Sequence, residues 1–506
     1  MPNKILGVSA GFHDAALTVM HDDEIVFAGH SERYSKQKND SNICSALEQA
    51  ALVYGPFDEI VYYEKPWKRQ LRKIISGEPW GGNWRVATEL KRSIPLIMTE
   101  HKGAIASVGH HLSHAAAGFQ TSPFDDAAVV VIDAIGEMDT ISIYKADYGD
   151  TTGYLGFKKH KHARYKRVYC QQYPHSIGMF YSAVTQRVGL RPMDEEYITM
   201  GMAAYGDASK AIGTLVDNLI DSVSTAKFKS NLHIGMQDLE FPADVNEMDI
   251  AAAGQHLCEQ LIIEVMRNAR ELTGSPNLVY MGGVALNCVA NSKLGELFDN
   301  IWIMPNPGDA GSSLGAAAAV YGKKVNWTTA LLGTDIPGKY PVKKLIKQLK
   351  TKKIVGVANG KAEFGPRALG NRSLLADPRG KEIKDKVNEI KRRQQFRPFA
   401  PVILEEHVND YFDMPKNQGT SHYMQVVAPV KDPVSFPAIT HADGTARVQT
   451  VPSNGSGIRL LLEAWYAQTG CPMLLNTSLN IRGEPMVDDR VDADRFEKEY
   501  GVTVCS

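Results

Sequence analysis

Alternating apolar and polar positions at the start of the chain predict three β-strands. Residues 4–8 and 15–20 are apolar and rich in β-branched side chains, and a tight polar turn at 21–24 leads into a third apolar stretch at 25–29. The loop between the first two strands, residues 9–14, contains glycine, histidine and aspartate. Such a loop can surround a phosphate with backbone N–H groups, and a simple edge meander is the alternative.

The next strong pattern is an alanine-rich stretch, residues 104–140, which predicts a helix followed by a buried strand. His110 and His114 lie four residues apart in the helical part, and a β-branched run at 127–132 ends on Asp133. Residues i and i+4 share one face of a helix, so both imidazoles can point at one ion, with Asp133 as an oxygen ligand. Histidine pairs with carboxylates suit Zn or Fe(II) better than Mg or Ca. Two histidines in ordinary hydrogen bonds are the competing interpretation, because many helices carry such pairs by chance.

In the middle of the chain an apolar stripe predicts a long helix that starts at Asp249, as its N-cap, and ends at Gly274. Two short strands follow, at residues 277–281 and 300–304, and each leads through a glycine-rich turn into a helix. Backbone N–H groups and a helix dipole converge at such turns, so the pair indicates nucleotide binding between two lobes. The expected contacts come from Gly282, Gly283, Asn287, Asp309, Gly311 and Ser312.

The pattern of residue types changes after residue 340, where a predicted basic helix at 342–353 leads into an apolar strand. The segment before it, GTDIPGKY at 333–340, nearly matches a phosphate-binding P-loop. Tyr340 stands where a Ser or Thr would hold Mg²⁺, and Pro337 interrupts the loop, so a linker is predicted instead.

Arginines recur at the ends of the predicted strands and turns in this last third. Arginine suits phosphate or carboxylate recognition because its planar fork donates two hydrogen bonds at once. A surface salt bridge explains each arginine taken singly, but the set beside Gly, Pro and Asn predicts a phosphate pocket. Its members are Arg367, Arg372, Arg379, Arg393, Arg397, Arg447 and Arg482.

Composition narrows the class of protein. The 506 residues predict two or three domains, and 43% hydrophobic with 22% charged residues is typical of a globular protein without membrane spans. A net charge of −1 gives no overall attraction to nucleic acid. The six cysteines include no CxxC motif, which argues against a disulfide framework or a cysteine zinc site. No signal peptide and no membrane segment are recognisable, so a cytoplasmic protein is expected.

Two charged stretches leave alternatives open. Residues 30–40, HSERYSKQKND, fit either a solvated loop or a loop that grips substrate. A denser basic run with aromatic side chains, residues 158–169, fits an exposed lysine-rich hairpin, and it also suits a DNA or nucleotide contact, as does the segment around Trp67.

Taken in order, the motifs resemble those of the NodU-type carbamoyltransferases nearly from end to end. They are GFHDAA, HHLSHAAAGF, DAIGE, GGVALN, GDAGSSLGAA, FGPRALGNRSLLADPR, FRPFAP, HADGTARVQ and NTSLNIRGEP. The resemblance implies an α/β chain of two modules. Residues 1–335 would form a two-lobed domain of the actin/Hsp70/sugar-kinase type, similar to the tRNA threonylcarbamoyltransferases. Residues 345–506 would form a YrdC-like α/β domain.

The activity that this resemblance implies is ATP-dependent O-carbamoyl transfer. The C-terminal module would make carbamoyl-adenylate from carbamoyl phosphate and ATP, with Mg. The N-terminal module would pass the carbamoyl group to an acceptor hydroxyl beside bound Fe(II) or another divalent metal. An internal channel is expected, because the adenylate would hydrolyse in water. The sequence allows a homodimer without specifying one.

Motif matching also implies roles for individual residues. The metal ligands would be His110, His114, Asp133 and Asp309. His13 would act as a base near the acceptor hydroxyl beside Asp14, with Lys38 steadying the developing charge. Contacts to carbamoyl phosphate and ATP would come from Arg367, Arg397, Arg447, Arg482, Asn476 and Ser478.

Two positions depart from the family pattern. Asp133 is followed by Ala134 where the family has glycine, which limits the backbone angles available. A family lysine is replaced by Ile198, so a contact made by that lysine is missing.

The sequence leaves two classes of acceptor hydroxyl. The basic run at 158–169 points to a hydroxymethylated pyrimidine in DNA or in a nucleotide, and a hydroxyl of a sugar or natural product is the alternative. The competing classes are a sugar-kinase-like phosphotransferase, which would need no carbamoyl phosphate, and a nucleotide-driven binding module of the Hsp70 kind.

Overall fold

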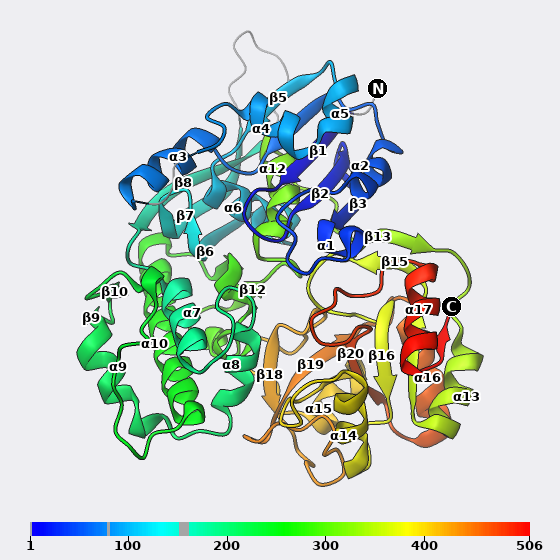
Figure 1. Cartoon of the computed structure of the whole chain (residues 1–506). Coiled ribbons are helices and arrows are strands. Elements are labelled where there is room, and N and C mark those ends of the chain that lie inside the picture. Colours follow the sequence, from blue (N-terminus) through cyan, green and yellow to red (C-terminus); the bar gives the residue numbers. More distant parts are fainter. Residues whose placement is uncertain (1–2, 78–80, 151–160) are drawn as a thin grey trace.

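The computed structural model describes residues 3–77, 81–150 and 161–506. They form an α/β protein with two five-stranded sheets in the N-terminal part and a seven-stranded sheet in the C-terminal part (Figure 1). None of the helices in these stretches combines the length and the apolar character that a bilayer crossing requires.

The first sheet has the order β3-β2-β1-β4-β5 and contains the three strands predicted at the start of the chain. β1 pairs antiparallel with β2 and parallel with β4, because the β2–β3 meander follows a tight turn whereas β4 and β5 are reached through helices. The elements of this lobe are β1 (Lys4–Ser9), β2 (Ala16–His21), β3 (Glu24–His30), α1 (Ser31–Ser35), α2 (Ser45–Leu52), β4 (Glu59–Tyr62), α3 (Pro66–Ile75), α4 (Val86–Ser93), α5 (Pro95–Glu100) and β5 (Ala104–Ser107).

The second sheet, β8-β7-β6-β11-β12, repeats this order and these strand directions. The repeat confirms the α/β class and the two-lobed N-terminal part predicted above. Its elements are α6 (His110–Thr121), β6 (Asp126–Gly136), β7 (Asp139–Asp150), β8 (Lys161–Gln172), α7 (Ile177–Arg187), α8 (Glu196–Ala203), α9 (Ile212–Leu219), β9 (Ile220–Ser222), β10 (Lys227–Phe228), α10 (Glu247–Thr273), β11 (Asn277–Met281), α11 (Cys288–Asn291), β12 (Asn300–Trp302) and α12 (Ser312–Tyr321).

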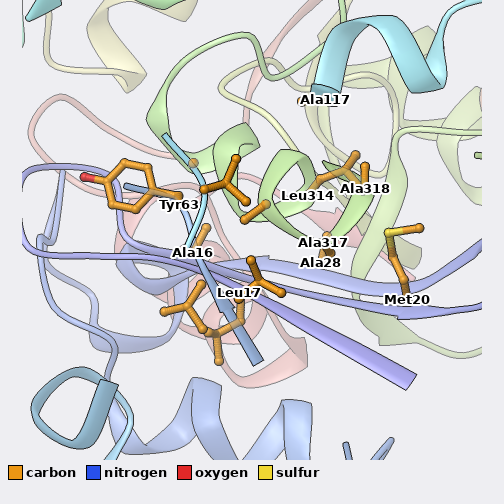
Figure 2. Packing of buried hydrophobic residues seen from close by; sticks show 14 of the residues in the cluster. Ala16, Leu17, Met20, Ala28, Tyr63, Ala117, Leu314, Ala317 and Ala318 are labelled. Carbon is orange, nitrogen blue, oxygen red and sulfur yellow. The ribbon is translucent and has the colours of Figure 1, made fainter. Parts of the chain in front are cut away.

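Two alanine-rich helices, α6 and α12, pack against each other, α12 on the first sheet and α6 on the second. They approach so closely that a Cβ on Gly315 would lie 1.7 Å from the Ser113 carbonyl oxygen, and one on Gly7 would lie 1.8 Å from that of Ser313. Figure 2 shows the same packing, with Ala317 and Ala318 among the buried side chains next to the first sheet. Small residues are needed here because two helix backbones and a strand meet without room for side chains.

The C-terminal sheet has the order β18-β19-β17-β20-β16-β14-β21 and its own apolar core. It is the mixed α/β layer expected of the second module. The elements of the C-terminal part are β13 (Leu331–Ile336), α13 (Val342–Lys352), β14 (Ile354–Ala358), β15 (Gly360–Glu363), β16 (Arg372–Ala376), α14 (Lys381–Ile390), β17 (Ala400–Leu404), α15 (Val408–Tyr411), β18 (Val426–Pro429), β19 (Thr445–Val451), α16 (Gly457–Thr469), β20 (Met473–Ser478), α17 (Arg490–Tyr500) and β21 (Val504–Cys505), of which β13 and β15 form a separate two-stranded sheet.

The structure corrects several local predictions. The charged stretch at 30–40 is not all loop, because helix α1 begins at Ser31 and buries Arg33. The predicted linker at 333–340 overlaps strand β13, which pairs with β15. The N-cap of α10 is Asn246, and Asp249 instead completes a capping box with it. The division between residues 335 and 345 stays a prediction.

Candidate active site

The metal site predicted from the histidine pair is one compact cluster. The ligand atoms of His110, His114, Asp133 and Asp309 lie within 4.8 Å of one another, and all four residues are buried. Asp133 Oδ2 is 3.0 Å from His110 Nε2, and Asp309 Oδ1 is 3.3 Å from His114 Nε2. The helical spacing, strand β6 and the turn before α12 therefore bring together residues almost 200 positions apart in sequence.

Local backbone features position these side chains. Helix α6 starts at His110, so both histidines lie in its first turns. A Cβ on Gly136 would lie 2.2 Å from the His110 ring, so only glycine leaves room for the imidazole. Asp309 begins a short 3-10 turn directly before α12.

Hydrogen bonds orient the ligand atoms. The carbonyl oxygen of Pro307 lies 3.0 Å from His114 Nδ1 and can only accept, so Nδ1 carries a proton and Nε2 faces the cluster, where it can hold a second proton or bind an ion. Asp133 Oδ1 accepts from the backbone N–H groups of Ala134 and Gly283, at 2.9 and 3.2 Å, which leaves Oδ2 for the cluster.

The electrostatics of the cluster call for a positive charge at its centre. Burial alone would raise the pKa of Asp133, but hydrogen bonds from His110 and His114 outweigh it and lower that pKa well below its usual range. The two Nε2 atoms face each other at 3.1 Å. A lone pair beside two carboxylates is unfavourable unless a proton or a cation lies between them. Two imidazoles with two carboxylates are a fitting donor set for Fe(II) or Zn.

His13 and Asp14 form a pair beside this cluster. His13 Nδ1 lies 3.0 Å from Asp14 Oδ2. Burial acts to lower the pKa of His13, but the hydrogen bond and charge of Asp14, together with the charges of Asp309 and Asp133, raise it to about 9. Lys38 behaves alike: burial would lower its pKa, and Glu32 raises it. Both side chains therefore carry positive charge at neutral pH in the chain by itself.

A second group of charged residues, the arginine group, forms no ion pair with a carboxylate of the described residues. It consists of Arg367, Lys391, Arg393, Arg397 and Arg447. Burial and the nearby Arg447 lower the pKa of Arg367 to about 9, and burial with neighbouring cations also lowers the pKa values of Lys391, Arg393 and Arg397. Buried cations that repel one another favour an anionic ligand.

The arginine group and two members of the cluster, Asp133 and Asp309, line a single cavity of about 770 Å³. Its wall also includes His13, so the N-terminal part contributes His13 and the two aspartates and the C-terminal part contributes the arginine group. The volume lies in the range of small-molecule sites, which are a few hundred to about 1,000 Å³. One chamber therefore connects the cluster suited to a metal with the side chains suited to phosphates.

Most of the residues predicted to bind ligand line this cavity. They are His13, Asp14, Lys38, Gly283, Asn287, Arg367, Arg397, Arg447, Asn476, Ser478 and Arg482. Arg482 also pairs with Glu195 at 3.1 Å.

Three predicted ligand contacts are not on the cavity wall. A Cβ on Gly282 would lie 2.2 Å from the Ile132 carbonyl oxygen, and one on Gly311 would lie 1.9 Å from that of Asn306. These glycines are therefore required by backbone packing. Ser312 is buried at the start of α12.

Two arginines of the predicted phosphate pocket have structural roles instead. Arg372 is fully buried and donates to backbone carbonyl oxygens, among them those of Thr334 and Asp488, at 2.8 Å each. Arg379 forms a two-pronged pair with Asp377. Their place at strand ends resembles that of Arg447, and only the fold distinguishes them.

The prediction missed two residues of this region. Glu64 Oε2 lies 3.8 Å from His110 Nδ1. Lys391 reaches into the cavity and donates to Ser478 and Asn480. Lys391 stands in the cationic segment IKRRQQFRPFAP, which was a usable signal, whereas no local pattern marks Glu64.

The basic run at 158–169 is strand β8 from Lys161 onward, and residues 158–160 lie outside the described part. Arg164 and Arg167 pair with Asp147 and Asp139 at 2.6 and 2.9 Å. In the described part β8 is an edge strand, and cationic side chains there hinder pairing with other chains. None of the residues 161–169 lines the cavity. A nucleic-acid contact through this run stays a prediction.

The two departures from the motif pattern are accommodated. The glycine at 178 makes room for Ala134, since a Cβ there would lie 2.7 Å from the Ala134 Cα. Ile198 is buried in α8, with part of it on the cavity wall.

Two family models match the chain, Carbamoyltransferase N-terminus over residues 62–318 and Carbamoyltransferase C-terminus over residues 346–505. An uncharacterized protein of Synechocystis sp. is 33% identical over 97% of this chain and 93% of its own length. Nodulation protein NolNO of Sinorhizobium fredii is 29% identical over 95% of this chain and 76% of its own. Nodulation protein U of the same organism is 28% identical over 93% and 92%.

Proposed function

Because this chain belongs to the carbamoyltransferase family, we propose that it makes carbamoyl-adenylate from carbamoyl phosphate and ATP and transfers the carbamoyl group to an acceptor hydroxyl. The observation that carries this proposal is the shared cavity, which has uncompensated cations at one end and the His–Asp cluster at the other. The cationic end suits polyanionic substrates, and the His–Asp end suits a metal-assisted acyl transfer.

The arginine end is the proposed site of activation. Its guanidinium groups, with Ser478, would hold the phosphates of carbamoyl phosphate and of ATP with Mg. Water attacks carbamoyl phosphate, the carbonyl-to-phosphate linkage breaks, and carbamate and phosphate form. An oxygen of the carbamate then attacks the α-phosphorus of ATP, and pyrophosphate departs. Cations that repel one another in the free protein gain most when these anions bind.

The His–Asp end is the proposed site of transfer. His110, His114, Asp133 and Asp309 would hold a divalent ion, which would supply Lewis acidity for the carbamoyl carbonyl. The acceptor oxygen attacks this carbonyl carbon, the bond to the adenylate oxygen breaks and AMP leaves. His13 lies on the cavity wall to take the hydroxyl proton, with Asp14 orienting its ring through Nδ1.

The size of the cavity favours a small acceptor. A volume of about 770 Å³ must hold the adenylate together with the acceptor. A nucleotide or a sugar fits such a space, whereas a pyrimidine in duplex DNA would have to be flipped out of its stack to reach His13. We therefore propose a hydroxyl on a small molecule, with a hydroxymethylated pyrimidine nucleotide as one member of that class.

The decisive experiment has two stages. Purified protein with a divalent metal, Mg, ATP and carbamoyl phosphate should release pyrophosphate, and omission of carbamoyl phosphate should stop that release. Mass spectrometry should then find one added carbamoyl group on a member of a panel of hydroxymethylpyrimidine nucleotides, hydroxymethylcytosine DNA and sugar derivatives. Phosphate transfer that needs no carbamoyl phosphate would instead establish a kinase-like enzyme.

A further inference from the structure

A buried amide at the arginine end of the cavity has an oxygen without a hydrogen-bond donor. Asn476 is 1% exposed, belongs to strand β20 and lines the cavity. Its Nδ2 donates to the Ala368 carbonyl oxygen at 3.0 Å and to Gln449 Oε1 at 2.7 Å. Its Oδ1 accepts no hydrogen bond from the described residues. A buried polar atom left in this state costs free energy, so its position needs an explanation.

The orientation of this amide is fixed by its neighbours. Gln449 Nε2 donates to the Leu369 carbonyl oxygen at 3.1 Å, and a carbonyl can only accept, so Gln449 must present Oε1 to Asn476. Asn476 must in turn place Nδ2 between that oxygen and the Ala368 carbonyl. The two amides and two carbonyls therefore leave only Oδ1 of Asn476 for a ligand.

Packing on the sheet places the amide pair beside the cavity. Asn476 lies opposite Ala400 of β17, and Gln449 of β19 lies opposite Val402. Ala400 is small and itself lines the cavity, so the two long amide side chains meet above it. Ala368, which accepts from Asn476, directly follows Arg367, and Arg447 precedes Gln449 by two positions on the same face of β19.

The surroundings decide which ligand group the oxygen suits. The neighbouring side chains Arg367 and Arg447 are hydrogen-bond donors, which suit the oxygens of a phosphate. An acceptor among such donors suits an N–H group attached close to that phosphate. Carbamoyl phosphate has this arrangement, since its amino group and its phosphate flank one carbonyl carbon.

We propose that Asn476, held in place by Gln449, selects the carbamoyl group over other acyl groups by accepting a hydrogen bond from its amino group. This inference rests on the proposed function and goes beyond it by assigning the specificity for the acyl substrate. Asn476 is then a specificity-determining residue, and Gln449 is a positioning residue.

Acetyl phosphate tests the inference, because it carries a methyl group where carbamoyl phosphate has the amino group. The measured quantity is the ratio of the inhibition constant of acetyl phosphate to the KM of carbamoyl phosphate, both from pyrophosphate release. The wild-type ratio should be well above one, and Asn476→Leu should lower it by roughly tenfold to a hundredfold. Gln449→Met, which frees the amide to turn, should lower it severalfold even if the first variant folds poorly.

A matched control is available in the same chain. Asn291 is equally buried, its Nδ2 donates to the carbonyl oxygens of Ala285 and Gln425, and its Oδ1 also accepts no hydrogen bond from the described residues. It does not line the cavity. Asn291→Leu should therefore leave the ratio unchanged while showing what the loss of a buried amide does to stability.

Three results would overturn the inference. In the first, Asn476→Leu raises both constants by the same factor, which indicates a role in holding phosphate. In the second, the KM of ATP rises while the ratio of the acetyl phosphate inhibition constant to the carbamoyl phosphate KM stays unchanged. Asn476 Oδ1 would then accept from the amino group of adenine. In the third, the wild-type protein releases no pyrophosphate with carbamoyl phosphate, and then the proposed function fails together with the inference.

Discussion

The two ends of the cavity handle charge in opposite ways. At the His–Asp end, two carboxylates and two imidazoles lie within 4.8 Å, and backbone groups such as the Pro307 carbonyl fix their orientation. At the arginine end, burial and the nearby Arg447 lower the pKa of Arg367, and burial, Arg397 and Arg447 lower the pKa of Arg393. The first end mixes both signs of charge within one cluster, whereas buried cations predominate at the second. The comparison indicates that the first end is built around a cation and that the second depends on its substrates for negative charge.

The largest expected effect comes from removing one ligand of the His–Asp cluster. His114→Ala should reduce carbamoyl transfer by more than about a hundredfold, because the ion loses an oriented imidazole. Pyrophosphate release that depends on carbamoyl phosphate should persist, since His114 does not line the cavity at the arginine end. Assaying both reactions on one preparation gives the comparison directly.

The mirror-image change is Arg447→Ala at the other end. Loss of its charge-assisted hydrogen bonds to phosphate should slow adenylate formation by about tenfold to a hundredfold. Pyrophosphate release measures this step. If both variants lost both activities to the same extent, the division of labour between the two ends would be wrong.

The next effect concerns pH and the transfer step. The raised pKa of His13, about 9, means that the neutral base form is scarce at pH 7 and grows as pH rises towards that value. If His13 takes the acceptor proton, single-turnover transfer should accelerate about tenfold between pH 7 and pH 8. The His13→Ala variant should transfer the carbamoyl group slowly, at a rate that does not change between pH 7 and pH 8. A wild-type rate that falls as pH rises would assign His13 the role of a cation instead.

The smallest expected effect is on thermal stability. Pyrophosphate at a hundred times its Kd should stabilise the folded protein by about 2.7 kcal/mol, seen as a rise of a few degrees in Tm. Arg447→Ala should shrink this rise without lowering the Tm of the free protein, because a repelling cation is removed. Chloride at matched ionic strength serves as the control. An equal rise in Tm with chloride would contradict a site whose unpaired cations bind pyrophosphate specifically.

Periodicity and turn chemistry made much of this site predictable. The i, i+4 spacing placed His110 and His114 on one face. Asp133 lies beside them as expected, although strand β6 does not end there and continues to Gly136. Glycine turns after β11 and β12 were also recognisable, although Gly282 and Gly311 pack closely against backbone and do not line the cavity.

Long-range packing set the limit of these predictions. Arg372 and Arg447 have similar neighbours in sequence, yet one is buried against backbone carbonyls and the other lines the cavity. Glu64 approaches His110 only because parallel strand β4 ends near helix α6. The orphan oxygen of Asn476 depends on two other segments, which contribute Ala368 and Gln449. No local pattern carries such information.

Helix α12 packs closely on the first sheet, and this packing has a consequence for synthesis on the ribosome. The hydroxyl of Thr18 in β2 bonds to that of Ser313 at 2.7 Å, across 295 positions of the chain. Strands made first must therefore wait for a helix made much later before their inner surface is covered. In a nascent chain that ends before Ser312, this apolar surface is exposed to solvent. We expect such a chain to need chaperones or to aggregate.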